Sequence, residues 1–240
     1  MLNKRNAPKI AIALTTMLAI IKVFAGIFTG SLAVLSSAMD SMFDVLASSI
    51  NYVMIKKADE PPDTDHNFGH GKFESYASFL QSILIFATGI FLFYEASRRL
   101  YSGETPHITY VAAIVMCISI VVSLIITIML RTTAKREGSI ALHADAAHYA
   151  MDLLTNSGVI LALLIIKFTG MVWVDSVIAI IMAVYIMYSA FKIHVNALRI
   201  ILDARIPDED LKAITSVLDK YAPYFKNYHR LRARTDGYMI

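Results

Sequence analysis

Six apolar stretches of membrane-spanning length constrain this chain more than any other feature of its sequence. A helix of about 20 apolar residues is long enough to cross the hydrocarbon core of a bilayer. Two of the connections between stretches are only two or three residues long, which makes the flanking helices antiparallel neighbours. The sequence therefore predicts an all-α membrane protein, a six-transmembrane-helix bundle. We place the spans at Ile10–Thr29, Leu32–Ile55, Tyr76–Ala96, Ile108–Leu130, Leu142–Phe168 and Val172–Ile193.

The composition agrees with a membrane protein and excludes some other classes. Apolar residues make up 57% of the 240 residues, whereas a soluble domain usually has about 45–50%. The net charge is only +3, and no basic stripe interleaves with aromatic residues, so we expect no nucleic-acid partner. Cys117 is the single cysteine and lies inside an apolar run, which excludes an intrachain disulfide and a cysteine-rich metal motif.

The distribution of lysine and arginine predicts the orientation of the spans. Cytoplasmic loops of membrane proteins carry an excess of these two residues. One side of the predicted bundle carries only Arg98, Arg99 and Lys167. The other side carries the basic tail and Lys4, Arg5, Lys9, Lys56, Lys57, Lys72, Arg131, Lys135 and Arg136. We therefore expect a multi-pass protein with both termini in the cytoplasm.

Four ionisable side chains lie inside two of the apolar runs: Asp40 and Asp44 in the second, His148 and Asp152 in the fifth. Each pair is spaced four residues apart, so both members project from one face of a helix. A charge at the bilayer centre costs roughly 2.5–3.5 kcal/mol on insertion scales and needs a compensating partner. Three carboxylates and one imidazole suit a tetrahedral Zn²⁺, whereas Mg²⁺ and Ca²⁺ favour all-oxygen sites of higher coordination.

Two other interpretations of these four residues stay open from the residues alone. Buried polar side chains also hold membrane helices together through hydrogen bonds, and intramembrane ionisable groups also form proton relays without a metal. Two matched ionisable pairs favour a functional site over a purely structural network. We therefore predict a divalent metal site on the second and fifth spans.

Further motifs accompany these pairs. A Gly-His-x-Lys-x-Glu segment occupies Gly69–Glu74, after the second span. Trp173-Val174-Asp175 opens the sixth span, and Leu202-Asp203 is followed by Pro207. Together with the two ionisable pairs, these segments resemble the cation diffusion facilitator family of zinc and related-metal transporters, from about residue 10 to the end of the chain.

The resemblance implies functional residues. It implies a transport site at Asp40, Asp44, His148 and Asp152, similar to bacterial inner-membrane members that export zinc and in some cases ferrous iron or cadmium. It also implies a second metal site in the loop, at Asp63, His66 and His70. A solvated polar loop is the competing interpretation of that loop, and Asp65 is an alternate carboxylate. The habit of the family further implies a homodimer.

The last part of the chain has a different character. Pro207 followed by three acidic residues is typical of a helix start, and apolar residues then recur at helical spacing until Pro223. We predict a short strand at Tyr228–Arg234. These elements divide the chain into a six-helix transmembrane domain, residues 1–197, and a partial cytoplasmic α/β domain, residues 198–240. The resemblance implies a longer cytoplasmic domain, of which we expect these residues to be the beginning.

A few charged residues near the spans have predicted roles of their own. Lys72 and Asp203 have opposite charges at the membrane mouth, and we predict a buried ion pair that ties the third span to the end of the sixth, either within one chain or across a dimer. We interpret Lys22, inside the first span, as a packing or snorkelling lysine. His143 and Asp145 either pass the ion towards His148 or form an interfacial polar cluster.

These observations predict export of a divalent cation, Zn²⁺ first and Fe²⁺ or Cd²⁺ next, in exchange for protons. Metal ligands must be deprotonated to bind, and histidine is the side chain whose charge changes near neutral pH. We expect no prosthetic group and no enzymatic activity: Zn²⁺ is the transported substrate, and the partners are the metal ion, protons, the lipid bilayer and a second copy of the chain. The alternatives are a membrane-embedded zinc-dependent enzyme, for which four protein ligands leave no open position, and a non-transporting metal sensor.

Overall fold

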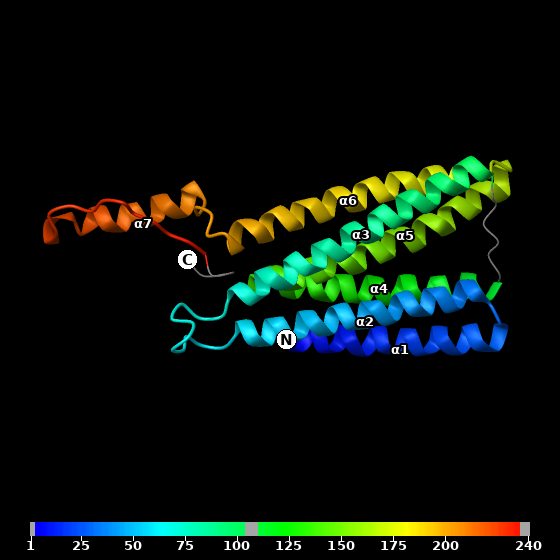
Figure 1. Cartoon of the computed structure of the whole chain (residues 1–240), viewed down its shortest axis with the longest axis horizontal. Coiled ribbons are helices and arrows are strands. Elements are labelled where there is room, and N and C mark those ends of the chain that lie inside the picture. The colour runs from blue at the N-terminus through cyan, green and yellow to red at the C-terminus, as the bar shows by residue number, and fades with distance from the viewer. Residues whose placement is uncertain (1–2, 104–109, 236–240) are drawn as a thin grey trace.

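The computed structural model describes residues 3–103 and 110–235 (Figure 1). Six long helices follow one another along the chain, and a shorter helix and a 3₁₀ turn lie beyond them. Their bounds are α1 Asn6–Thr29, α2 Leu32–Ala58, α3 Lys72–Ser102, α4 Tyr110–Glu137, α5 Ile140–Thr169, α6 Trp173–Ile201, α7 Asp208–Lys220 and η1 Ala222–Tyr224. Each predicted span corresponds to one long helix; the start of the fourth, at residues 108–109, lies outside the described residues.

Short polar connections set where the helices end. Helix α1 stops at Gly30, whose φ of +65° is the left-handed conformation that ends a helix and that glycine adopts without strain. Ser31 then begins α2 by accepting a hydrogen bond from the backbone N–H of Val34 at 3.5 Å. Ser139 begins α5 in the same way, through the N–H of Leu142 at 3.3 Å. These caps make the tight turns that keep consecutive helices antiparallel.

The helices form two groups that meet along α5. Helix α3 packs along α6, while α1 packs along α2, and α4 contacts α1 and α5. Helix α5 contacts α2, α3, α4 and α6 and lies between the two groups (Figure 1). Side chains on the inner faces of α2 and α5 therefore lie between neighbouring helices.

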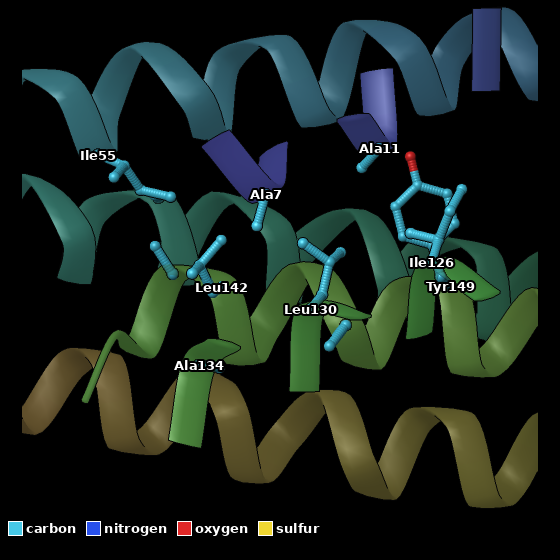
Figure 2. Close-up of a cluster of buried hydrophobic side chains, with 11 residues drawn as sticks. Ala7, Ala11, Ile55, Ile126, Leu130, Ala134, Leu142 and Tyr149 are labelled. Carbon is cyan, nitrogen blue, oxygen red and sulfur yellow. The ribbon is translucent and has the colours of Figure 1, made fainter. Parts of the chain in front are cut away.

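A compact cluster of small and branched side chains joins α1, α2, α4 and α5 near the ends of the helices (Figure 2). Ala7 and Ala11 of α1 are fully buried there, and their small side chains let α1 approach closely. Leu130 of α4 and Leu142 of α5 fill the space between the helices. Tyr149 completes the cluster, and its hydroxyl group points to one edge of it (Figure 2).

The outer surface of the bundle is apolar. Phe28, Phe91 and Phe168 are 84%, 68% and 83% exposed, an arrangement that costs free energy in water but not in lipid. Among the described residues, five helices, namely α1, α3, α4, α5 and α6, are long and apolar enough to cross a membrane. Helix α2 is 27 residues long but is not among them, and its centre carries Asp40 and Asp44. The chain is therefore a multi-pass membrane protein.

The tail agrees with the sequence in its helix and differs in its strand. Helix α7 begins at Asp208, directly after Pro207, and has no buried residue. The strand predicted at Tyr228–Arg234 is wrong, because this segment has no regular secondary structure. An isolated strand leaves its backbone groups unpaired, and the described part of the chain contains no second strand beside it. The described part of the tail is therefore helical without a strand, and the predicted α/β tail is not confirmed.

Candidate metal centres

A polar face runs along the inner side of α2. Ser37, Ser41, Asp44, Ser48 and Asn51 follow one another at intervals of three or four residues, so they lie on one side of the helix. Ser41, Ser48 and Asn51 are each no more than 2% exposed. Because lipid offers no hydrogen bonds to such groups, each needs a partner on a neighbouring helix. Helices α1 and α5 supply these partners.

The centre of this face carries three potential metal ligands. Asp44 Oδ1 lies 2.9 Å from His148 Nε2 of α5, and Asp152 Oδ2, one turn further along α5, lies 3.8 Å from the same nitrogen. One ligand atom from each of the three residues lies within 4.8 Å of the others. We call Asp44, His148 and Asp152 the intramembrane cluster. Two carboxylates and one imidazole at this separation can share one divalent cation.

Asp40 is not part of this group of three. It lies one turn before Asp44 on α2, and its side chain is exposed on the helix surface. The equal spacing of the two pairs predicted one site of four residues. Spacing alone does not fix the rotation of α2 against α5, and this rotation turns Asp44 more directly towards His148.

A network of hydroxyl groups supports the cluster from behind. The Tyr149 hydroxyl lies 2.8 Å from Thr15 Oγ1 of α1 and 2.8 Å from Ser48 Oγ of α2. Ser48 Oγ donates to Asp145 Oδ1 at 3.1 Å, and Asp145 is completely buried. The network joins α1, α2 and α5 directly beside His148. Sequence reasoning missed Thr15, Ser48 and Tyr149; the four-residue step from Asp44 to Ser48 was the only signal for them.

Lys22 is buried beside the cluster. It is 5% exposed, and its Nζ donates to Ser41 Oγ at 2.8 Å and to the backbone oxygen of Ser37 at 3.4 Å. Of the two interpretations of Lys22, packing agrees with this position and snorkelling does not, because its charged end stays inside the bundle. Its charge interacts with those of Asp44, Asp152 and Asp40. The bundle thus holds a lysine of its own next to the half-buried carboxylates of Asp44 and Asp152.

The second cluster lies in the loop between α2 and α3. His70 Nε2 lies 3.4 Å from Asp63 Oδ2, and His66 Nδ1 lies 3.6 Å from Asp63 Oδ1. One ligand atom from each of the three residues lies within 4.8 Å of the others. We call Asp63, His66 and His70 the loop cluster. His70 is 3% exposed, whereas Asp63 and His66 are exposed.

Backbone hydrogen bonds shape the loop cluster. Asp63 Oδ1 accepts from the N–H of His66 at 2.7 Å and from the N–H of Asp65 at 3.0 Å. These bonds, that of His66 first, lower the pKa of Asp63 below its ordinary value because they stabilise the ionised carboxylate. The same hydrogen bonds hold the carboxylate of Asp63 beside the two histidines. Asp65, the alternate carboxylate, is not part of the group.

Ion pairs join helix ends on the same side of the bundle. Lys72 Nζ lies 2.8 Å from Asp203 Oδ1 of the same chain, so the predicted pair forms. The prediction that the pair is buried is wrong, because the two side chains are 29% and 41% exposed. The hydrogen bond from Lys72 lowers the pKa of Asp203.

His143 and Asp145, predicted to act together, face different surroundings. Asp145 is buried against Ser48, whereas His143 is exposed at a cavity between α4 and α6.

Comparisons with known proteins agree with this architecture. The cation efflux transmembrane domain family matches residues 9–202. The cation-efflux pump FieF of Pectobacterium atrosepticum is 37% identical over 227 residues, which cover 95% of this chain and 75% of the pump. FieF of Serratia proteamaculans is 34% identical over 97% of this chain and 77% of the pump. FieF of Escherichia coli O1:K1 is 32% identical over 95% of this chain and 75% of the pump.

These relatives are named as pumps, which agrees with a transporter and not with an enzyme. The match covers α2 to α6 and all but the first three residues of α1, and therefore both helices of the intramembrane cluster. The chain thus belongs to the cation efflux family of membrane transporters, the family that its sequence motifs resemble.

Proposed function

We propose that this protein exports Zn²⁺ from the cytoplasm in exchange for protons and that the intramembrane cluster is its transport site. The observation that carries the proposal is the meeting of Asp44, His148 and Asp152 within 4.8 Å, between helices whose outer surfaces are apolar. In this proposal α2 also crosses the membrane, since Asp44 faces the polar site between α2 and α5. Both termini then lie in the cytoplasm, in agreement with the distribution of basic residues.

The ligand types favour zinc. Zn²⁺ accepts imidazole nitrogen and carboxylate oxygen together at about 2.0–2.2 Å, and the three side chains need only small movements to close around it. Asp40, one turn away, is our candidate for the fourth ligand. Fe²⁺ and Cd²⁺ are the next candidates, because imidazole and carboxylate groups also bind these ions without selecting for them.

Exchange for protons follows from the contacts of His148. Its Nε2 faces Asp44 at 2.9 Å and Asp152 at 3.8 Å. A proton on this nitrogen is stabilised by both carboxylates, and a metal ion binds there only after the proton leaves. The two cargoes therefore compete for one atom. Alternating exposure of this atom to the two sides of the membrane would couple their movements in opposite directions.

Lys22 has a part in this competition. Its ammonium group, held by Ser41, compensates the carboxylates when no metal is bound. A divalent cation must bind in the presence of this positive charge, which weakens binding enough for release. A site that transports an ion needs such moderate affinity, since a very tight site retains its cargo.

The loop cluster is a second proposed metal site, on the cytoplasmic side. Its residues lie outside the spans, so we assign it a role in collecting or sensing the ion and not in carrying it across. We also propose a homodimer, which the resemblance to the cation diffusion facilitator family supports. Two other functions, a membrane-embedded zinc-dependent enzyme and a metal sensor that transports nothing, are outcomes that the following test separates.

The test is zinc uptake into proteoliposomes that contain the purified chain, with and without an imposed pH gradient. We expect uptake that depends on the gradient in the wild-type protein and is lost in Asp152→Ala. Uptake at the same rate without a gradient would contradict proton exchange. Wild-type protein that binds zinc and moves none would contradict transport and favour a sensor.

A further inference from the structure

A basic cavity lies at the end of the bundle where α3 and α5 begin and α4 and α6 end (Figure 1). Its volume is about 690 Å³. Arg131 and Lys135 of α4, His143 of α5 and Lys192 of α6 line it, and none of the described lining residues is a carboxylate. These positive groups repel a divalent cation, so the cavity is not suited to the metal ion that the intramembrane cluster takes.

The basic side chains of α4 are available for a ligand. Among residues 3–103 and 110–235, no carboxylate oxygen lies within 4 Å of a side-chain nitrogen of Arg131 or Lys135. Both side chains are exposed at the cavity. Lys192 lies over the ring of Tyr188, with its Nζ 4.6 Å from the ring centre. An anion in the cavity would be the ionic partner that Arg131 and Lys135 lack.

The floor and one wall of the cavity also favour an anion. Ser78 of α3 is 2% exposed, and its Oγ has no hydrogen-bond partner among the described residues, although it lines the cavity. A buried hydroxyl without a partner is unfavourable, and a phosphate oxygen could accept a hydrogen bond from it. Gly138, Ser139 and Ile140 form the wall, so the positive end of the α5 dipole borders the same space.

We propose that this cavity binds the phosphate headgroup of an anionic phospholipid. Apolar side chains, Ala134, Ile140 and Ile193, stand next to the basic ones and suit the glycerol and upper acyl part of a lipid. Basic pockets between helix ends on the cytoplasmic side are a recurrent form of lipid recognition. Free phosphate shares the headgroup chemistry but has nothing to place against the apolar wall. The proposal is independent of which metal the protein carries.

The experiment measures binding of a fluorescent phosphatidylglycerol to the full chain in neutral detergent micelles, by anisotropy. Competitors are unlabelled phosphatidylglycerol, phosphatidylcholine and inorganic phosphate. We expect displacement by phosphatidylglycerol alone. Arg131→Gln/Lys135→Gln should weaken binding by about 25-fold, since each basic residue contributes roughly fivefold at an anionic surface. Ser78→Ala should weaken it by at least about tenfold, the value of one hydrogen bond to a charged group.

The matched control is Lys9→Gln/Lys56→Gln, which removes two basic residues that do not line the cavity. It should change binding by less than about twofold. An equal loss in this control, or displacement by phosphatidylcholine, would overturn the proposal, since binding would then lack a specific site. Displacement by inorganic phosphate would overturn the lipid as the occupant. Zinc binding by each variant, measured in parallel, verifies that the bundle is intact.

Discussion

The two clusters of carboxylate and histidine use the same residue types in different surroundings. The loop cluster lies within eight consecutive residues, from Asp63 to His70, and backbone N–H groups orient its aspartate. The intramembrane cluster joins α2 to α5, and Asp44 and His148 are 104 residues apart in the chain. A local turn is enough to form the first, whereas the second exists only when the bundle is folded. The two clusters therefore differ in position relative to the long helices and not in residue type.

The two clusters also differ in the groups that surround and compensate their charged side chains. At the loop cluster water and two histidines surround one exposed aspartate. At the intramembrane cluster, Lys22 and the hydroxyl network of Thr15, Ser48 and Tyr149 replace water. Because the environment is enclosed, each group there has a larger effect on binding. The following predictions test this contrast, from the largest expected effect to the smallest.

Asp44→Asn should have the largest effect on zinc binding. It removes the charged ligand that faces His148 at 2.9 Å, so affinity at the intramembrane cluster should fall at least about 100-fold, beyond the loss typical of residues behind a ligand. Calorimetric titration in a His66→Ala/His70→Ala background isolates this cluster. Asp65→Asn is the control with the same chemical change. A loss below about tenfold would show that Asp44 is not a ligand.

Lys22→Met should have the opposite effect. Without the buried ammonium group, the carboxylates attract a cation more strongly, and zinc affinity should rise on the order of tenfold, which corresponds to about 1.4 kcal/mol of removed repulsion. Slower release should lower the turnover of transport. The same titration measures affinity, and Lys167→Met, an exposed lysine at the end of α5, is the control. Weaker binding in Lys22→Met would contradict the role assigned to this charge.

Tyr149→Phe should destabilise the bundle without removing a ligand. It breaks the bonds to Thr15 and Ser48, and such bonds between membrane helices contribute about 0.6–1.7 kcal/mol. A loss of this size lowers the thermal midpoint of a 150–250-residue protein by about 2–4 °C per kcal/mol. Tyr185→Phe, an exposed tyrosine at 54%, is the control for thermal unfolding in detergent. An unchanged midpoint would mean that the network does not join the three helices.

Asp63→Asn should have the smallest effect on transport. The loop cluster lies outside the spans, so zinc flux should stay within about twofold of wild type, as for most surface substitutions. The stoichiometry of bound zinc should fall, because the loop loses its charged ligand. Counting bound zinc in parallel with flux tests both statements. Flux lost together with the loop metal would remove the distinction between the two clusters.

The pH dependence of the loop should reflect the lowered pKa of Asp63. The hydrogen bonds from His66 and Asp65 stabilise the ionised form, so their contribution is complete above the ordinary value of 3.8 and is lost as the pH falls through the lowered pKa. Amide hydrogen exchange of His66, corrected for its intrinsic rate, should therefore stay slow at a pH just above 3.8. In Asp63→Ala it should be fast throughout. Equal exchange in both proteins would contradict the shift.

Local features of the structure were predictable from the sequence, and long-range ones were only partly so. Apolar run lengths predicted the six long helices, and the proline and acidic residues at 207–210 predicted the start of α7. The ion pair between Lys72 and Asp203 followed from opposite charges at neighbouring helix ends. In each case the physical cause lies in a short stretch of sequence.

The remaining features depend on how the helices rotate and pack. Equal spacing could not show that Asp44 enters the group of three and Asp40 does not. The contact between Thr15 and Tyr149 spans 134 residues and involves side chains with ordinary positions in an apolar helix. Packing and snorkelling both stayed open for Lys22, because only the folded bundle decides whether a long side chain reaches the membrane surface or turns inward. The strand at Tyr228–Arg234 failed because strands need partners that the described residues do not supply.

The most direct test of the account compares zinc flux through three proteins reconstituted in equal amounts: wild type, Asp152→Asn, and His66→Asn/His70→Asn. All three would be assayed under one imposed pH gradient. The account predicts that the loop variant transports zinc at nearly the wild-type rate, whereas Asp152→Asn transports none. Transport that persists in Asp152→Asn, or that stops in the loop variant while the intramembrane cluster still binds zinc, would contradict it.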